Sequence, residues 1–107
     1  MISVTHFEVD PSDGAFADRA QAALAALAAR PGYLDGHIGR STDDDRCWVM
    51  VTRWADVGSY RRALGGYEVK ITATPLLAQA RDLPSSFEAL VHIAEDGAVT
   101  ARPSDRA

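Results

Sequence analysis

The strongest strand signal in the chain is the segment CWVMVTRW at residues 47–54. Side chains alternate between the two faces of a strand, so Cys47, Val49 and Val51 share one face. The other face carries the larger side chains, which are Trp48, Met50, Thr52 and Trp54. Because both faces are apolar, this segment predicts a central strand that is covered on both sides.

The elements on either side of this strand complete an α+β order. The predicted strands are 2–9, 33–41, 47–54 and 87–93, and the predicted helical segments are 15–30, 56–64 and 67–81. Pro11-Ser12-Asp13-Gly14 is a turn, and Ser12 or Asp13 is the expected N-cap of the first helix. Pro75 is expected to begin the second piece of the last helical segment. The resulting β-α-β-β-α-β order is the ferredoxin-like arrangement.

Length and composition limit the possible classes of protein. The 107 residues correspond to one domain, expected over residues 1–96, with a frayed C-terminal tail over residues 97–107. A formal net charge of −4 without a basic run disfavours nucleic acid as a partner. The single cysteine, Cys47, allows no internal disulfide. With no long apolar run and no signal-peptide pattern at the start, the sequence predicts a cytoplasmic protein without a membrane partner.

A single sheet with helices on one face leaves its other face uncovered. We expect that uncovered face to carry Trp48, Met50 and Trp54. An apolar patch of this kind on a small protein is typical of an interface or a ligand cleft. The pattern therefore predicts a homodimer that packs sheet against sheet, with a pocket between each sheet and its helices.

Three motifs carry a resemblance to a known family. They are RPGYLDGH at residues 30–37, VMVTRW at residues 49–54, and the pair Asp56 and Tyr60. Pro75-Leu76-Leu77 and the residues Ser85, Phe87 and Glu88 extend the pattern. Over roughly residues 2–94 the chain resembles the antibiotic biosynthesis monooxygenase-like domains. The resemblance implies a dimeric α+β barrel with a cavity between each sheet and its helices.

The resemblance also implies an activity. Some similar proteins are monooxygenases that oxidise aromatic, polyketide-like phenols without metal, flavin or haem, so no cofactor and no metal are expected here. In those proteins the strand-end tryptophan and the following tyrosine line the pocket, and they match Trp54 and Tyr60. A strand asparagine four residues before the tryptophan takes part in them, and Met50 stands at that position. Haem-degrading relatives use a histidine on the second helical segment, and residues 57–81 contain none.

The remaining site candidates come from residue chemistry. We expect Trp48, Met50 and Tyr67 to line the substrate pocket, with Tyr67 sharing a helical face with Tyr60. An imidazole titrates near neutral pH and serves as a general base. His37 is a candidate catalytic group, either paired with Asp35 or at the surface. His6 and His92 lie on the predicted first and last strands and would be neighbours at the pocket.

The acids of Thr42-Asp43-Asp44-Asp45-Arg46 are interpreted as a solvated hairpin loop, because their spacing is not that of a calcium loop.

Three functions remain open from the sequence. The first is a cofactor-independent monooxygenase that acts on an apolar aromatic small molecule, with Trp54, Tyr60 and His37 as catalytic residues. The second is a non-catalytic binding or accessory dimer on the same fold, which the apolar Met50 favours. That dimer would hold an apolar ligand or a partner protein. The third is a domain that merely dimerises as a structural unit, which predicts no ligand of any kind.

Overall fold

A four-stranded antiparallel sheet forms the centre of the molecule, in a computed structural model that describes residues 1–106. Its strands are β1 (Ile2–Glu8), β2 (Tyr33–Arg40), β3 (Cys47–Trp54) and β4 (Ser86–Phe87), in the order β2-β3-β1-β4. β3 lies between β2 and β1, so the prediction of a central strand at residues 47–54 is confirmed.

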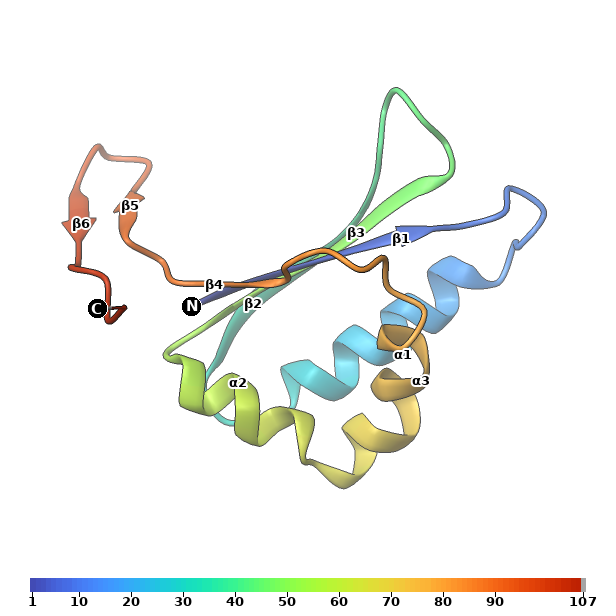
Figure 1. The fold of residues 1–107 in the computed structure, drawn as a ribbon, viewed down its shortest axis with the longest axis horizontal. Helices are drawn as coiled ribbons and strands as arrows, with labels where there is room; N and C mark the ends of the chain where they lie inside the picture. Colours follow the sequence, from blue (N-terminus) through green and yellow to red (C-terminus); the bar gives the residue numbers. More distant parts are fainter. Residues whose placement is uncertain (107) are drawn as a thin grey trace.

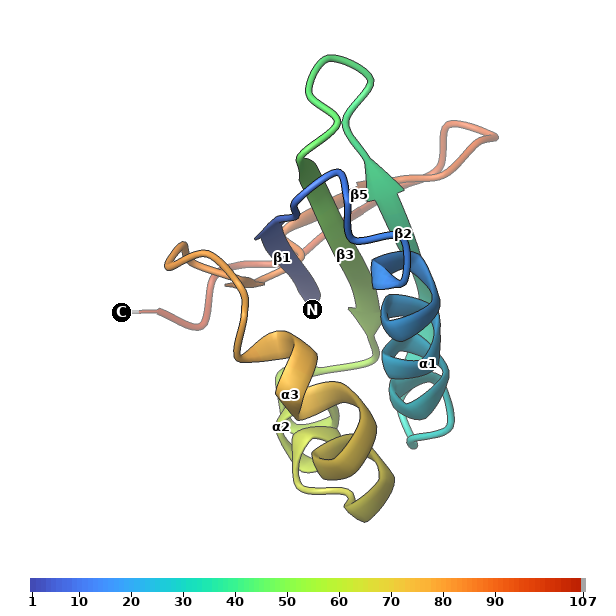
Figure 2. The same ribbon diagram turned by 90° about the vertical axis from the view of Figure 1, so that its right-hand side faces the viewer.

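All helices cover one face of this sheet (Figure 1). They are α1 (Phe16–Ala28), α2 (Val57–Leu64), a π-helical turn η1 (Val69–Ala73) and α3 (Thr74–Leu77). In Figure 2, α1 lies against β2, while α2 and α3 lie beside it. The predicted α+β, ferredoxin-like fold class is confirmed. Within residues 1–106, no helix has the length and apolar character needed to cross a bilayer.

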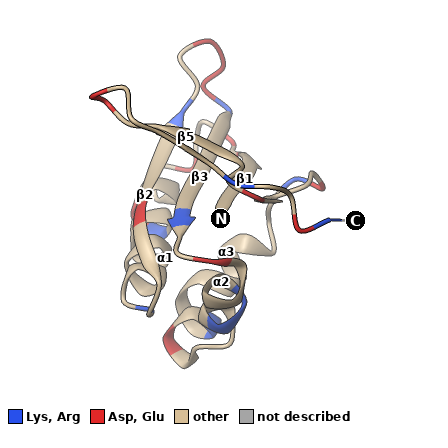
Figure 3. Cartoon of the chain, turned by 90° about the vertical axis from the view of Figure 1, so that its left-hand side faces the viewer, with Lys and Arg blue, Asp and Glu red and all other residues tan. Residues whose placement is uncertain are grey.

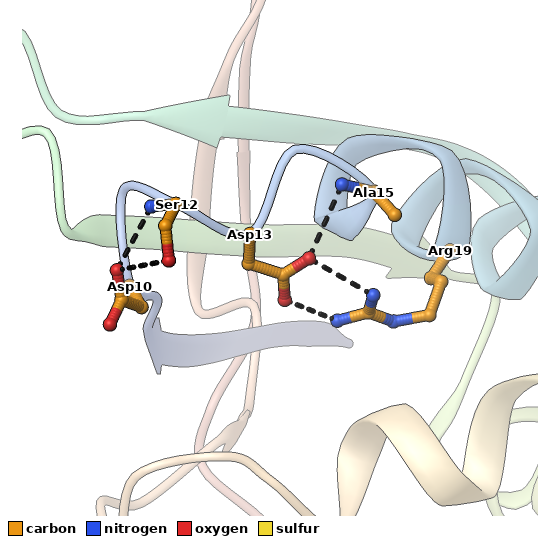
Figure 4. Close-up of polar contacts among 5 residues, drawn as sticks. All are labelled: Asp10, Ser12, Asp13, Ala15 and Arg19. Carbon is orange, nitrogen blue, oxygen red and sulfur yellow. Dashed lines mark hydrogen bonds and ion pairs between the residues drawn. The ribbon is translucent and has the colours of Figure 1, made fainter.

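The first helix begins one residue after its predicted start, but neither Ser12 nor Asp13 is its N-cap. Its N-cap is Ala15, which provides no side-chain hydrogen bond. The Asp13 carboxylate instead accepts from the Ala15 backbone N–H at 3.2 Å and pairs with Arg19 at 2.7 Å (Figure 4). This contact with Arg19, above all, holds the pKa of Asp13 below its ordinary value. Asp10 closes the preceding turn by accepting from the Ser12 N–H and hydroxyl.

The large side chains of β3 lie on the sheet face that the helices cover, and not on the uncovered face as expected. Met50 and Trp54 are 2% and 1% exposed and face the helices, and Trp48 packs on Phe16 of α1 with ring centroids 5.2 Å apart. The uncovered face instead carries smaller, half-buried side chains, which are Ile2, Val4, Val49 and Val51. The alternation in the sequence shows which side chains share a face of the strand. Only the packing of the helices decides which of the two faces is covered.

The C-terminal region departs from the predicted last strand at 87–93. Only Ser86 and Phe87 pair with β1, and the chain then leaves the sheet. Residues 91–93 form β5 (Val91–Ile93), which pairs with β6 (Val99–Ala101) in a separate hairpin. β6 therefore occupies part of the segment that was expected to fray. The hairpin, called the arm below, extends away from the helices (Figure 1).

Candidate active site

The indole of Trp54 is the centre of the candidate site. Trp54 ends β3 on the face towards the helices and is 1% exposed. Tyr33 and Tyr60 pack edge-to-face against the indole, with ring centroids 5.4 Å and 5.6 Å from it. Tyr33 lies beside it on β2, and Tyr60 approaches from α2. Trp54 and Tyr60 are thus in contact, whereas the residues that line the hollow described below include Trp54 and not Tyr60.

The N–H of this indole is already used within the protein. It donates to Thr52 Oγ1 at 2.8 Å, and Thr52 is itself 2% exposed. Thr52 lies two residues before Trp54, so the two side chains share a face of β3. The indole N–H is therefore not free to bond a ligand, whereas the Thr52 hydroxyl retains a proton that it can donate.

Two further hydroxyls lie beside this pair. Ser3 is the direct partner of Thr52 across the β1–β3 ladder and is 3% exposed. The Ser3 Oγ lies 3.3 Å from the Tyr60 phenol oxygen, within hydrogen-bonding distance. Ser3, Thr52 and Tyr60, called the hydroxyl cluster below, thus come together from β1, β3 and α2 beside the Trp54 indole.

The start of α2 fixes the position of Tyr60. The Asp56 carboxylate caps this helix by accepting from the Ser59 N–H at 2.7 Å. This hydrogen bond is the main reason that the pKa of Asp56 lies below its ordinary value. Gly32, with φ of +89°, passes so close to Ser59 that a Cβ there would lie 2.4 Å from the serine side chain. The preceding loop and the helix cap together hold α2 against the end of β3.

The other aromatic and apolar candidates divide between two ends of the sheet. Met50 is buried on the same face of β3 as Thr52 and Trp54, and its side chain adds an apolar surface there. Trp48 is at the far end of β3, beneath the Arg40 guanidinium at 5.5 Å. Tyr67 lies beyond the end of α2 and is 74% exposed, so the structure does not bring it to the face that carries Tyr60.

None of the three histidines lies with the Trp54–Tyr60 pair. His37 is exposed on β2 opposite Val51, on the face without helices. Its suggested partner Asp35 binds Arg53 instead, with Oδ1 at 2.9 Å from Nε, which is the main cause of the lowered pKa of Asp35. His6 lies on β1 and His92 on the arm, so the expectation that they are neighbours is wrong. That expectation depended on a continuous last strand at residues 87–93, and this strand does not form.

A hollow of about 560 Å³ adjoins Trp54 at the end of the sheet. The first turn of α2 forms one side of it, and the chain from β4 into the arm forms the other. Arg53 and Arg61 both line it, together with Asp56. Its volume is within the range of small-molecule sites. Among residues 1–106, no three His, Cys, Asp or Glu side chains gather as a metal site requires.

Ser3 and Thr52 were missed by the sequence analysis. Each is a small polar residue in a β-rich segment. Thr52 lies within the VMVTRW motif but was given no role, and Ser3 belongs to no motif. Because Thr52 and Trp54 are two residues apart on a predicted strand, the sequence alone places them on the same face. Register is needed to place Ser3 opposite it, and the sequence does not give that register.

Comparison with known proteins identifies the family. The model of the family described as antibiotic biosynthesis monooxygenase matches residues 1–73. The chain belongs to this family, which confirms the resemblance stated above. No curated protein sequence matches it significantly.

Solved structures agree with this assignment. A variant of SnoaB, a cofactor-independent oxygenase from Streptomyces nogalater, is 28% identical with a TM-score of 0.66, covering 75% of this chain and 82% of that one. The structure of SnoaB determined to 1.9 resolution covers 99% of this chain and 96% of its own at 24% identity, with a TM-score of 0.66. A conserved protein from Methanosarcina mazei shares 19% identity with a TM-score of 0.65, covering 79% and 84%. The last two likenesses show the fold.

Proposed function

We propose that this chain is a cofactor-independent monooxygenase that oxidises an electron-rich aromatic small molecule. The observation that carries the proposal is the contact of the half-buried Tyr60 ring with the buried Trp54 indole, with hydroxyls beside them. Family membership and the similarity to SnoaB support it. The hollow beside Trp54 supplies space for a molecule of a few rings.

The reaction needs no redox group from the protein. An anthrone-like substrate loses a proton, and the resulting anion supplies the electrons that reduce dioxygen. One oxygen atom of O2 becomes a carbonyl at the former CH2 carbon, and the other leaves as water with the two hydrogens. The protein contributes by binding the anion, moving protons and excluding bulk water.

Each residue of the pair has a distinct part in this reaction. The Trp54 face holds the aromatic rings of the substrate, since its N–H is bonded to Thr52. The Tyr60 phenol, paired with Ser3, hydrogen-bonds the substrate oxygen at which negative charge develops. The Asp56 cap keeps Tyr60 against the indole.

Oxygen uptake tests this proposal with a panel of anthrones, hydroquinones and naphthols. We expect uptake above the uncatalysed rate that is insensitive to chelator. Trp54→Ala should abolish it, and Tyr60→Phe should reduce kcat by roughly 10-fold or more. Tyr33→Phe is the matched control, because it packs on the same indole while its hydroxyl lies over Gly36, outside the hydroxyl cluster. Full activity in folded Trp54→Ala contradicts the proposal.

A non-catalytic binding protein is the second candidate function. The buried Met50 favours it, because a thioether in the sheet row of Thr52 and Trp54 offers only weak hydrogen bonding to a reacting oxygen. In that case, the same compounds raise the melting temperature without oxygen uptake. Chelator-insensitive uptake in the wild type excludes this second function.

We also propose that two copies pair through the uncovered sheet face. That face carries half-buried aliphatic side chains, and the adjacent arm exposes Val91, Ile93 and Val99 by 63–64% each. Figure 3 shows that the arm strands carry no charged residue, because its acids gather at the turn. A two-stranded hairpin is marginally stable by itself in water, which favours its packing against a second copy. Light scattering is expected to give twice the mass of one chain.

A further inference from the structure

The hollow beside Trp54 gathers apolar side chains that the fold leaves exposed. Among its lining residues, four large apolar side chains are 41–54% exposed: Leu34, Val57, Phe87 and Leu90. They come from β2, from the start of α2 and from the chain at and after β4, which meet at one end of the sheet (Figure 1). Exposed apolar residues that are scattered singly are ordinary, whereas a group around one concave space is typical of a ligand site.

The hollow is also rich in arginine. It is lined by four of the chain's 11 Lys and Arg residues but by only three of its 15 Asp and Glu residues. Arg53 is paired with Asp35. Arg61 and Arg102 also line the hollow, and within residues 1–106 neither guanidinium takes part in a hydrogen bond or an ion pair. Two guanidinium groups are therefore available to a ligand in the hollow.

The acids of the hollow do not serve as partners for these two arginines. Asp56 caps α2 by accepting from the Ser59 N–H at 2.7 Å. Glu88 accepts from the Ser104 hydroxyl at 2.6 Å and from the Asp105 N–H at 3.0 Å. The third acid, Asp105, forms no ion pair within residues 1–106. An anionic group that enters the hollow therefore displaces no ion pair of the two arginines.

The two guanidinium groups come from the two sides of the hollow. Arg61 lies on α2, which forms one side. Arg102 follows the arm on the other side, where its backbone N–H donates to the Leu90 carbonyl oxygen at 2.8 Å. A guanidinium forms charge-assisted hydrogen bonds with a carboxylate, and its planar fork of N–H groups matches the two carboxylate oxygens. A carboxylate in the hollow can thus gain a partner from either side.

We infer that Arg61 and Arg102 make this hollow selective for aromatic ligands that carry a carboxylate. The rings lie against the apolar side chains of the wall, and the carboxylate accepts from the two guanidinium groups. A volume of about 560 Å³ is sufficient for a molecule of this size. The inference rests on the hollow used in the proposed function, and it adds two specificity-determining residues and a charged group to the substrate class.

Calorimetric titration at pH 7 with two matched probes tests the inference. The first, 2-naphthoate, has two aromatic rings and a charged carboxylate. The second, 2-naphthamide, has the same rings with a neutral amide in place of the carboxylate. We expect the wild type to bind 2-naphthoate more tightly, and Arg61→Gln or Arg102→Gln to weaken 2-naphthoate by roughly 3- to 5-fold each. The affinity for 2-naphthamide should stay within about 2-fold, because the apolar contacts are retained.

Added salt separates the charged contact from the apolar one in the same experiment. Salt screens interactions between exposed charges, so it should weaken the binding of 2-naphthoate and leave that of 2-naphthamide nearly unchanged. A preference for 2-naphthoate that salt does not reduce would contradict recognition by the two arginines.

Two matched controls locate the binding. Arg62 is the next residue of α2 but does not line the hollow, and its guanidinium lies 3.4 Å from the Ser59 hydroxyl. Arg62→Gln should therefore retain the preference for 2-naphthoate. Leu34→Ala should weaken both probes, because it removes part of the apolar wall, whereas Leu83→Ala, which changes a residue of similar exposure outside the hollow, should weaken neither.

All of these substitutions are at exposed positions, so each variant is expected to fold. Equal affinity of the wild type for the two probes, or no binding of either, would overturn the inference. The same loss in Arg62→Gln as in Arg61→Gln would also overturn it, since the effect would then not depend on the hollow.

This binding test is independent of catalysis. A preference for 2-naphthoate that depends on Arg61 and Arg102, without oxygen uptake on any phenol, rejects the monooxygenase and retains the inference. Oxygen uptake that depends on Trp54, with equal affinity for the two probes, rejects the inference and retains the monooxygenase.

Discussion

Two tyrosine rings and a threonine hydroxyl surround the indole of Trp54 within the protein. Edge-to-face aromatic contacts of this kind add about 0.5–1.5 kcal/mol each beyond the area they bury. The indole is therefore held in one orientation before any ligand arrives. A site that is ordered in advance loses less entropy on binding.

The packing around Gly36 in β2 leaves no space for a side chain. A Cβ there would lie 2.6 Å from the Tyr33 hydroxyl, 2.9 Å from Leu24 Cδ1 and 3.0 Å from the Val51 carbonyl oxygen. Gly36→Ala should destabilise the fold by about 1–3 kcal/mol, because the Tyr33 and Leu24 side chains would have to shift and the Val51 carbonyl cannot move aside easily. Denaturant unfolding measures the change.

Gly39 supplies the matched control for this prediction. It lies on the same strand, but the nearest atom to a Cβ there is Val49 Cγ2 at 3.6 Å, an ordinary contact. Gly39→Ala should change the free energy of unfolding by no more than about 0.5 kcal/mol. Similar losses in both variants would show that lack of space at Gly36 is not the cause.

At the scale of elements, α2 depends on its cap. Asp56→Ala removes the acceptor of the Ser59 N–H and should lower the melting temperature by roughly 4–8 °C at pH 7. Asp56→Asn keeps a capping oxygen and should lose less. A scanning calorimeter gives both values, and equal losses would contradict capping as the mechanism.

The same cap should make stability depend on pH. The Ser59 N–H lowers the pKa of Asp56 in the folded state, so the carboxylate stabilises the fold fully above its unfolded pKa of about 3.9. That contribution is lost as the pH falls through the lower, folded pKa. Unfolding measured from pH 5 downwards should show a smaller loss in Asp56→Asn than in the wild type. An identical decline would assign the acid sensitivity to Asp13 and Asp35, whose pKa values are also lowered.

Elements with a local cause could be predicted from the sequence. Alternation in residues 47–54 identified β3, and Pro31-Gly32 ended the first helix near its observed end. The arm was missed because Phe87, Ala89, Val91 and Ile93 alternate like one continuous strand. The Asp96-Gly97 pair was the available signal, since Gly97 adopts φ of +88° in the turn between β5 and β6.

The site was only partly predictable for a related reason. The motif placed Trp54 and Tyr60 together, because each follows from a short spacing along the chain. Ser3 and Thr52 are 49 positions apart by their numbering and meet only through the β1–β3 register. The face on which Trp48, Met50 and Trp54 lie depends on the packing of distant helices, which alternation does not contain.

At the scale of the whole molecule, the arm is the feature that a second copy would explain. Val91 and Ile93 are 64% and 63% exposed, so replacing either by Asp should not destabilise a single copy. In a dimer that buries the arm, Val91→Asp or Ile93→Asp should shift the mass towards one chain, because an unpaired buried charge is costly. Sedimentation measures this shift.

Ile71 is the control on the helical side. It is 54% exposed on η1, away from the uncovered sheet face, and Ile71→Asp should leave the mass unchanged. A loss of association in Ile71→Asp as well, or none in the arm variants, would place the interface elsewhere.

The two tryptophans give the protein two intrinsic fluorophores at opposite ends of one strand. Trp54 emits from a fully buried environment beside the hydroxyl cluster, whereas Trp48 lies half-buried beneath the Arg40 guanidinium. Replacing Trp48 by Phe leaves a single emitter at the candidate site. Its emission spectrum and quenching then report occupancy at Trp54 alone, and comparison with the wild type separates that signal from changes at the far end of β3.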